Sequence, residues 1–164
     1  MHQVAYGAAL ALHVLTAVAG FGMLGLSGLY GSWGRRLNST KDLRDLRQFF
    51  GSPNRIGRCL WVVPFAGGAA LWLSHGLGAL GQAWVLAALV CWAGATVIAV
   101  VVIWPGERQI RLVLADLAQT RVQEVTDETK AELVARCRPV VRAAAVCDVI
   151  FVVALGLMVL KPGQ

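Results

Sequence analysis

The side chains best suited to carry chemistry are three histidines in or beside long apolar runs. His13 lies near the middle of the first run, His75 toward the end of the second, and His2 close to the amino terminus. Imidazole is the usual axial ligand of b-type haem, and two histidines on different helices of a bundle can hold one iron. The spacing therefore predicts His13 and His75 as the haem ligands.

Two other interpretations of these histidines stay open. In the first, His13 hydrogen-bonds a neighbouring carbonyl or Thr16, and His75 lies among lipid headgroups. In the second, His2, His13 and His75 bind copper, but no cluster of Met or Cys accompanies them, as a copper site would favour. We therefore predict no separate metal site, and haem binding and the structural interpretation both stay open.

Asp148 is the only acidic residue within an apolar run. A carboxyl group is costly inside a bilayer, so Asp148 is expected to face the bundle interior, paired or protonated. The candidate partners are Arg142, six residues earlier, His13 on another helix, and Thr96. A proton-relay or orienting role and a purely structural hydrogen bond both stay open. No sequence signature of a known catalytic centre occurs, so no catalytic residue is assigned.

Four apolar runs account for most of the chain, which is 57% hydrophobic and 15% charged. They cover residues 4–30, 60–77, 84–104 and 140–160, and each approaches or exceeds the roughly 20 residues that cross a bilayer. The sequence thus predicts an all-α, integral membrane four-helix bundle, with residues 1–164 forming a single membrane domain.

The distribution of basic residues predicts the orientation. Fourteen of the fifteen Lys and Arg residues lie between residues 32 and 59 or between 105 and 142. Basic segments beside spans stay in the cytoplasm, so 32–59 and 105–139 are predicted cytoplasmic loops and both chain ends lie outside. We expect a multi-pass protein of the bacterial inner membrane. The net charge of +6 is explained by this topology, and no soluble basic domain remains for nucleic acid.

Both loops are predicted to contain amphipathic helices. In the first, Leu43, Leu46 and Phe50 recur at helical spacing before Gly51 and Pro53, which predicts a short basic helix on the inner membrane surface.

In the second loop, the third span is expected to continue past Pro105. A further helix begins at Thr126 or Thr129, and Pro139 is expected to start the last span.

Small residues and cysteines have simpler interpretations. The first and second spans contain the following small residues: Gly20, Gly22, Gly25, Gly28, Gly31 and Gly67-Gly68-Ala69-Ala70. Such residues let helices approach closely, although they can also make room for a flat porphyrin. Cys59, Cys91, Cys137 and Cys147 show no C-x-x-C spacing and no pair on the oxidising side, so neither a disulfide nor a zinc site is predicted.

Several segments carry a family resemblance. His13 in Leu12–Val18, the glycine-rich Phe21–Gly25, Asn54–Arg58 and Pro105–Arg108 resemble a group of small bacterial membrane proteins with four or five spans. The group includes the copper-resistance D type, the membrane-bound J-type protoporphyrinogen oxidase and integral membrane families of unknown function, which the chain resembles most. The resemblance to the oxidase implies a haem-binding role for His13. This chain has no basic residue in the first-span glycine motif and no Lys in the third span, so the oxidase activity does not follow.

Two classes of function are therefore expected. The first is a membrane protein that binds b-type haem in a redox or haem-related role. The second is a non-catalytic membrane subunit or scaffold, which binds other membrane protein subunits or forms a homo-oligomer through its glycine faces and cytoplasmic helices. In both, the lipid bilayer surrounds the spans.

Overall fold

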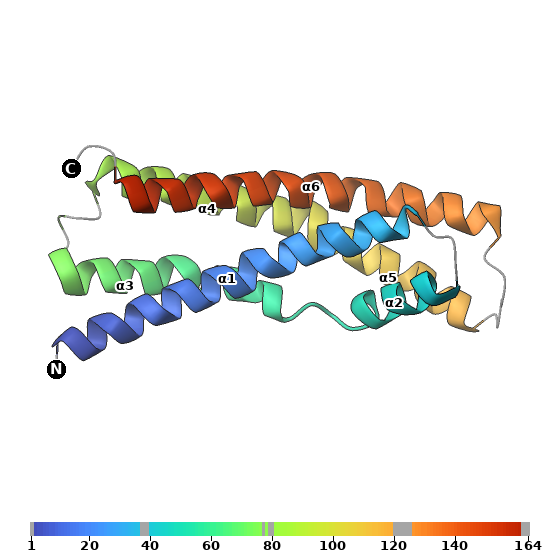
Figure 1. The fold of residues 1–164 in the computed structure, drawn as a ribbon, viewed down its shortest axis with the longest axis horizontal. Coiled ribbons are helices and arrows are strands. Elements are labelled where there is room, and N and C mark those ends of the chain that lie inside the picture. The colour runs from blue at the N-terminus through green and yellow to red at the C-terminus, as the bar shows by residue number, and fades with distance from the viewer. Residues whose placement is uncertain (1, 37–39, 77, 79–80, 120–125, 162–164) are drawn as a thin grey trace. The chain divides into compact units, whose positions relative to one another are not determined.

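The computed structural model describes residues 2–36, 40–76, 78, 81–119 and 126–161, and these are helical with no strand among them. The elements, labelled in Figure 1, are α1 (His2–Gly34), α2 (Thr40–Phe50), the 3-10 helix η1 (Ile56–Trp61), α3 (Val63–His75), α4 (Ala83–Ile98), the π-helical turn η3 (Ala99–Ile103), α5 (Trp104–Gln119) and α6 (Asp127–Leu160). The predicted all-α class is confirmed.

Four helical stretches of the described chain are long and apolar enough to cross a bilayer, as predicted. They are His2–Gly34, Ile56–His75, Ala83–Ala118 and Asp127–Leu160. Their lengths exceed or match the ~20 residues that the hydrocarbon core requires, and each has an apolar window. The chain therefore has the build of a multi-pass integral membrane protein.

The last two spans are longer than the apolar runs alone suggested. The third continues through Pro105 into α5, as predicted. No separate helix begins at Pro139, because α6 runs without interruption from Asp127 and contains that proline. Proline inside a helix removes one backbone hydrogen bond, and long helices of membrane proteins tolerate this loss. The predicted start is confirmed at Thr126, whose hydroxyl accepts a hydrogen bond from the Thr129 N–H at 3.3 Å.

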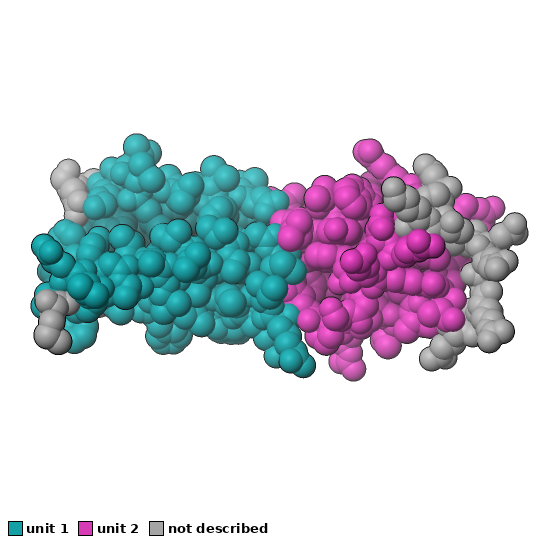
Figure 2. All heavy atoms as spheres, turned by 60° about the horizontal axis from the view of Figure 1, so that its bottom comes forward, with its two compact units in different colours: residues 1–23, 55–97, 147–164 teal, residues 24–54, 98–146 magenta. Residues whose placement is uncertain are grey.

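The described chain groups into two compact units (Figure 2). Unit 1 comprises residues 1–23, 55–97 and 147–164, and unit 2 comprises residues 24–54 and 98–146. Unit 2 holds twelve of the fifteen basic residues and eight of the nine acidic ones. Unit 1 is thus nearly free of charge. Both α1 and α6 contribute residues to both units. That residues 1–164 form a single membrane domain stays a prediction.

The helix predicted in the first basic stretch is confirmed as α2, but its apolar face is covered by protein. Leu43, Leu46 and Phe50 are all buried, at 6%, 0% and 2% exposure. A Cβ built on Gly34 would lie 3.5 Å from the methyl carbons of Leu46, so the end of α1 supports this face, and α2 also contacts α5. The apolar side of α2 therefore packs within unit 2 instead of lying on the bilayer.

Some of the glycines of α1 mark helix contacts, as predicted, and Gly22 does not. In unit 2, a Cβ on Gly28 would lie 2.6 Å from Cβ of Ala144, and one on Gly31 would lie 3.0 Å from Val141. By contrast, a Cβ on Gly22 would meet no atom within 4 Å. Of these two contacts, the one at Gly28 is the closer. It leaves no room for a methyl group on residue 28, because the Cβ atom of Ala144 cannot rotate away.

We expect Gly28→Ala to destabilise the protein by about 1–3 kcal/mol, the usual cost of inserting a methyl group into a packed contact. Unfolding in mixed detergent micelles with increasing sodium dodecyl sulfate measures this loss. Gly22→Ala is the matched control on the same helix, because the space around it is open. Equal stability of the two variants would contradict the close approach of α1 to Ala144.

Candidate functional site

A cavity of about 270 Å³ lies within unit 1 and contains both histidines that the sequence singled out. Its walls come from α1, α3, α4 and the end of α6. The lining is mostly apolar, and its members with polar or aromatic groups are Tyr6, His13, Ser74, His75, Trp84, Trp92 and Lys161. The fold thus brings His13 and His75 to one cavity, although 62 residues separate them in the chain.

The imidazole of His13 is held by the backbone of the second span. Its Nδ1 lies 2.9 Å from the carbonyl oxygen of Val63. A carbonyl only accepts hydrogen bonds, so Nδ1 carries the proton and donates, and Nε2 keeps its lone pair. The interpretation without haem allowed a bond from His13 to a neighbouring carbonyl or to Thr16, and the first of these forms. The Thr16 hydroxyl instead bonds the carbonyls of Leu12 and His13 at 2.7 and 3.1 Å.

Gly67 provides the space that this ring occupies. A Cβ at position 67 would lie 2.8 Å from both Nδ1 and Cε1 of His13. The neighbouring Gly68 also lines the cavity, yet a Cβ there would meet no atom within 4 Å. Gly67 therefore makes a close contact, as predicted for the small residues, but the contact is with the His13 side chain and not with a helix backbone.

His75 also makes a hydrogen bond through Nδ1. Its Nδ1 lies 2.6 Å from the Ser74 hydroxyl oxygen, and that hydroxyl is 3.1 Å from the carbonyl of Leu71. If the single proton of the Ser74 hydroxyl goes to the Leu71 carbonyl, Nδ1 of His75 donates to Ser74. Both histidines then offer Nε2 as the free nitrogen, which is the form that binds a metal. His75 is the more exposed of the two.

One cation and two tryptophans complete the cavity. Nζ of Lys161 lies 5.8 Å from the centre of the Trp84 ring, a cation–π distance. The indole nitrogen of Trp92 donates to the carbonyl of Leu60 at 2.8 Å, which orients this mid-span tryptophan. Among the described residues, Lys161 is the only Lys or Arg side chain that lines the cavity. The arrangement suits a ligand with an apolar body and an anionic group.

Asp148 is not part of this site, and the prediction that it faces the interior was wrong. Asp148 is exposed on α6, whereas its neighbour Cys147 is fully buried, with Sγ 3.8 Å from the Ala95 carbonyl. Successive residues point about 100° apart around a helix, so the packing of Cys147 turns Asp148 outward. In the described chain no hydrogen bond or ion pair joins Asp148 to the expected partners Arg142, His13 or Thr96. Thr96 bonds the Trp92 carbonyl instead.

A buried carboxyl group that sequence reasoning missed lies in unit 2. Glu107 of α5 is 4% exposed, and its Oε1 accepts hydrogen bonds from the Ser27 hydroxyl at 2.5 Å and from the Asn54 amide at 3.5 Å. The guanidinium of Arg111, one turn later, interacts electrostatically with this carboxyl group. Arg111 also donates to the Phe50 carbonyl at 2.8 Å. These bonds join α1, α5 and the segment that follows α2.

The helical spacing of the sequence already indicated that the Glu107 carboxyl group is buried. Glu107 precedes Ile110, Leu114 and Leu117 by three, seven and ten residues, so it shares their apolar face. All three are buried, at 0%, 3% and 8% exposure. Because Glu107 lies on the apolar side of an amphipathic helix, it was a stronger candidate for a buried carboxyl group than its position in a predicted loop suggested.

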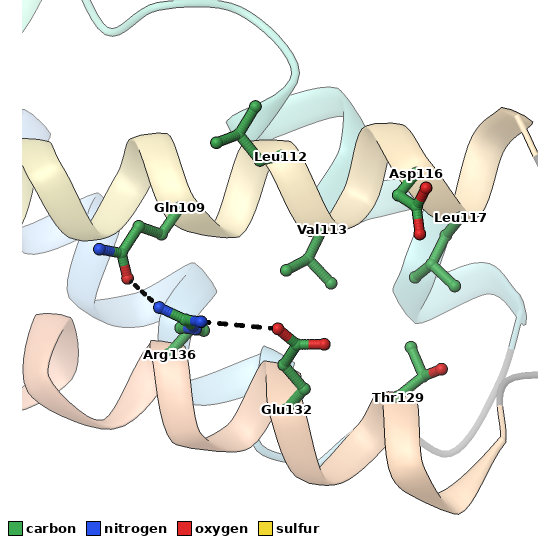
Figure 3. A pocket seen from close by; sticks show the side chains of 8 residues that line it. All are labelled: Gln109, Leu112, Val113, Asp116, Leu117, Thr129, Glu132 and Arg136. Carbon is green, nitrogen blue, oxygen red and sulfur yellow. Dashed lines mark hydrogen bonds and ion pairs between the residues drawn. The ribbon is translucent and has the colours of Figure 1, made fainter.

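Unit 2 also has an open pocket of about 410 Å³ between α5 and α6, shown in Figure 3. Arg136 lies at one end, where it donates to the Gln109 side chain at 2.5 Å and pairs with Glu132 at 3.6 Å. Arg136 and Glu132 thus pair with each other at the surface of this pocket. This pocket has neither a histidine nor a deeply buried polar group, so we assign it no chemistry.

Two further observations concern metals and thiols. Among the described residues, no group of three His, Cys, Asp or Glu side chains is placed to hold a metal ion, and His2 does not join His13 and His75 in such a group. The cysteines Cys59, Cys91, Cys137 and Cys147 all have free thiols.

Comparisons of the chain with protein-family models, with curated proteins and with solved structures give no match. The residues of the cavity are therefore the basis on which its function is inferred.

Proposed function

We propose that this multi-pass membrane protein binds b-type haem in the cavity of unit 1, where Nε2 of His13 would hold the iron. The observation that carries the proposal is the bond from His13 Nδ1 to the Val63 carbonyl. Histidines that bind metals almost always donate their other ring N–H in this way, which fixes the tautomer and the ring orientation. The resemblance of the first span to haem-binding membrane proteins supports the same role.

The other residues of the cavity fit this group. His75, from the facing α3, is the candidate for a second residue that would hold the iron, because its Nε2 is also free of the Ser74 bond. Apolar walls and two tryptophans suit a porphyrin ring, and Lys161 suits a propionate. The volume of about 270 Å³ is slightly below the ~300 Å³ at which common ligand pockets begin, so a porphyrin would need space beyond the cavity as well.

Haem in this position supplies one-electron chemistry, and the chain supplies the orientation of the ligand. The Val63 carbonyl holds the imidazole, Gly67 leaves room for it, and the apolar walls exclude water from the ring. We propose the topology that the basic residues predict, with both chain ends outside a bacterial inner membrane. The cavity then opens in the outer half of the bilayer.

Purified protein, expressed with ample haem, should show a Soret band. His13→Ala should abolish it and His75→Ala should shift or weaken it. His2→Ala is the control, because His2 does not line the cavity, and its spectrum should match the wild type. A wild-type protein without a Soret band under these conditions refutes haem binding and favours the alternative function, a non-catalytic membrane subunit or scaffold.

A further inference from the structure

Asp148 has an unusual position, since it is an exposed acidic residue within an apolar span. From Ala143 to the end of α6 at Leu160 the chain has no other acidic or basic residue. The side chains that follow it on the same face are also exposed, namely Val152 at 66%, Leu155 at 51% and Val159 at 73%. The carboxyl group is thus surrounded by residues that suit lipid or another helix.

This position is unfavourable for a chain that is surrounded by lipid alone. Acyl chains offer no hydrogen bonds, and an acidic side chain in a span almost always faces protein or water. The described residues provide Asp148 with no hydrogen bond or ion pair. Of the four spans, α6 is also the one least covered by its own chain, because 17% of its most apolar window is buried, against 22–28% for the others.

We propose that this face of α6 binds the same face of a second copy of the chain, so that the two Asp148 carboxyl groups hydrogen-bond to each other. Copies inserted in the same orientation can be related by a two-fold axis along the membrane normal, which places identical residues at equal depth. A protonated carboxylic acid both donates and accepts hydrogen bonds, so two Asp148 side chains complement each other when at least one of them keeps its proton. A different partner would need its own donor at that depth.

The spacing of the face fits such a contact. Asp148, Val152, Leu155 and Val159 are separated by four, three and four residues, which is the seam of a left-handed helix pair. A single polar residue at one seam position sets the register and the number of chains in helical assemblies. The proposal does not depend on haem, because Asp148 does not line the cavity.

The oligomeric state of the full-length protein in mild detergent and in nanodiscs tests the proposal. The wild type should be a dimer, and Asp148→Leu should weaken dimerisation about tenfold, the range of one interhelical hydrogen bond in a membrane. Asp148→Asn should stay dimeric, because an amide also donates and accepts. Val153→Leu, an exposed position on another side of α6, is the matched control.

Cross-linking gives an independent measurement. In a background without native cysteines, Val152→Cys should form a disulfide-linked dimer in oxidised membranes, and Val153→Cys should form much less. Three results would each overturn the pairing of two copies. They are a monomeric wild type, an Asp148→Leu variant that dimerises as strongly as the wild type, and a different protein bound at Asp148.

Discussion

Glu107→Ala should lower the free energy of unfolding by about 3 kcal/mol, the largest stability effect that we expect from a single polar substitution in this chain. Glu107 accepts the hydroxyl of Ser27, which is completely buried, and the Asn54 amide, and it lies near the guanidinium of Arg111. Removal of the carboxyl group deprives the buried Ser27 hydroxyl of this acceptor. Unfolding in mixed micelles measures the change.

Two further variants separate the hydrogen bonds from the charge. Glu107→Gln keeps an acceptor for Ser27 but loses the attraction to Arg111, so its destabilisation should be less than half as large. Glu128→Ala removes an exposed acid from the start of α6 and should change stability by no more than about 0.5 kcal/mol. If Glu107→Ala were as stable as Glu128→Ala, the buried network would have no part in holding unit 2 together.

Gly67→Ala should reduce haem occupancy at least tenfold without unfolding the protein. The added methyl group would lie 2.8 Å from Nδ1 and Cε1 of His13, so the imidazole must rotate away and lose its bond to the Val63 carbonyl. Loss of the bond that orients a metal-binding histidine typically costs 10–100-fold in metal affinity. The Soret absorbance per protein, after titration with haem, measures the effect.

Gly68→Ala is the control for this substitution. It adds the same methyl group to the same helix and to the wall of the same cavity, but in open space. Gly68→Ala should therefore bind haem nearly as well as the wild type, and both variants should elute as folded protein in size-exclusion chromatography. Equal haem binding by the two variants would show that the position of His13 over Gly67 does not matter to the ligand.

The sequence alone determined the helical elements of this protein, because their signals are local. A run of about 20 apolar residues must form a helix in a bilayer, where every backbone group needs an internal hydrogen bond. The start of α6 at Thr126 and the helix from Thr40 to Phe50 also follow from residues within one or two turns. Even so, Pro139 was misjudged as a boundary, because a long helix can lose one hydrogen bond and continue.

Which side of each helix is covered depended on the tertiary structure. In a span nearly every residue is apolar, so hydropathy gives little angular information, and Asp148 was placed inside although Cys147 occupies that side. For the same reason Glu107 was left in a loop, although α1 and Asn54 enclose it. His13 was predicted from its chemistry, but its tautomer depends on the Val63 carbonyl, fifty residues away. Only the packing of helices distant in sequence brings such groups within hydrogen-bonding distance.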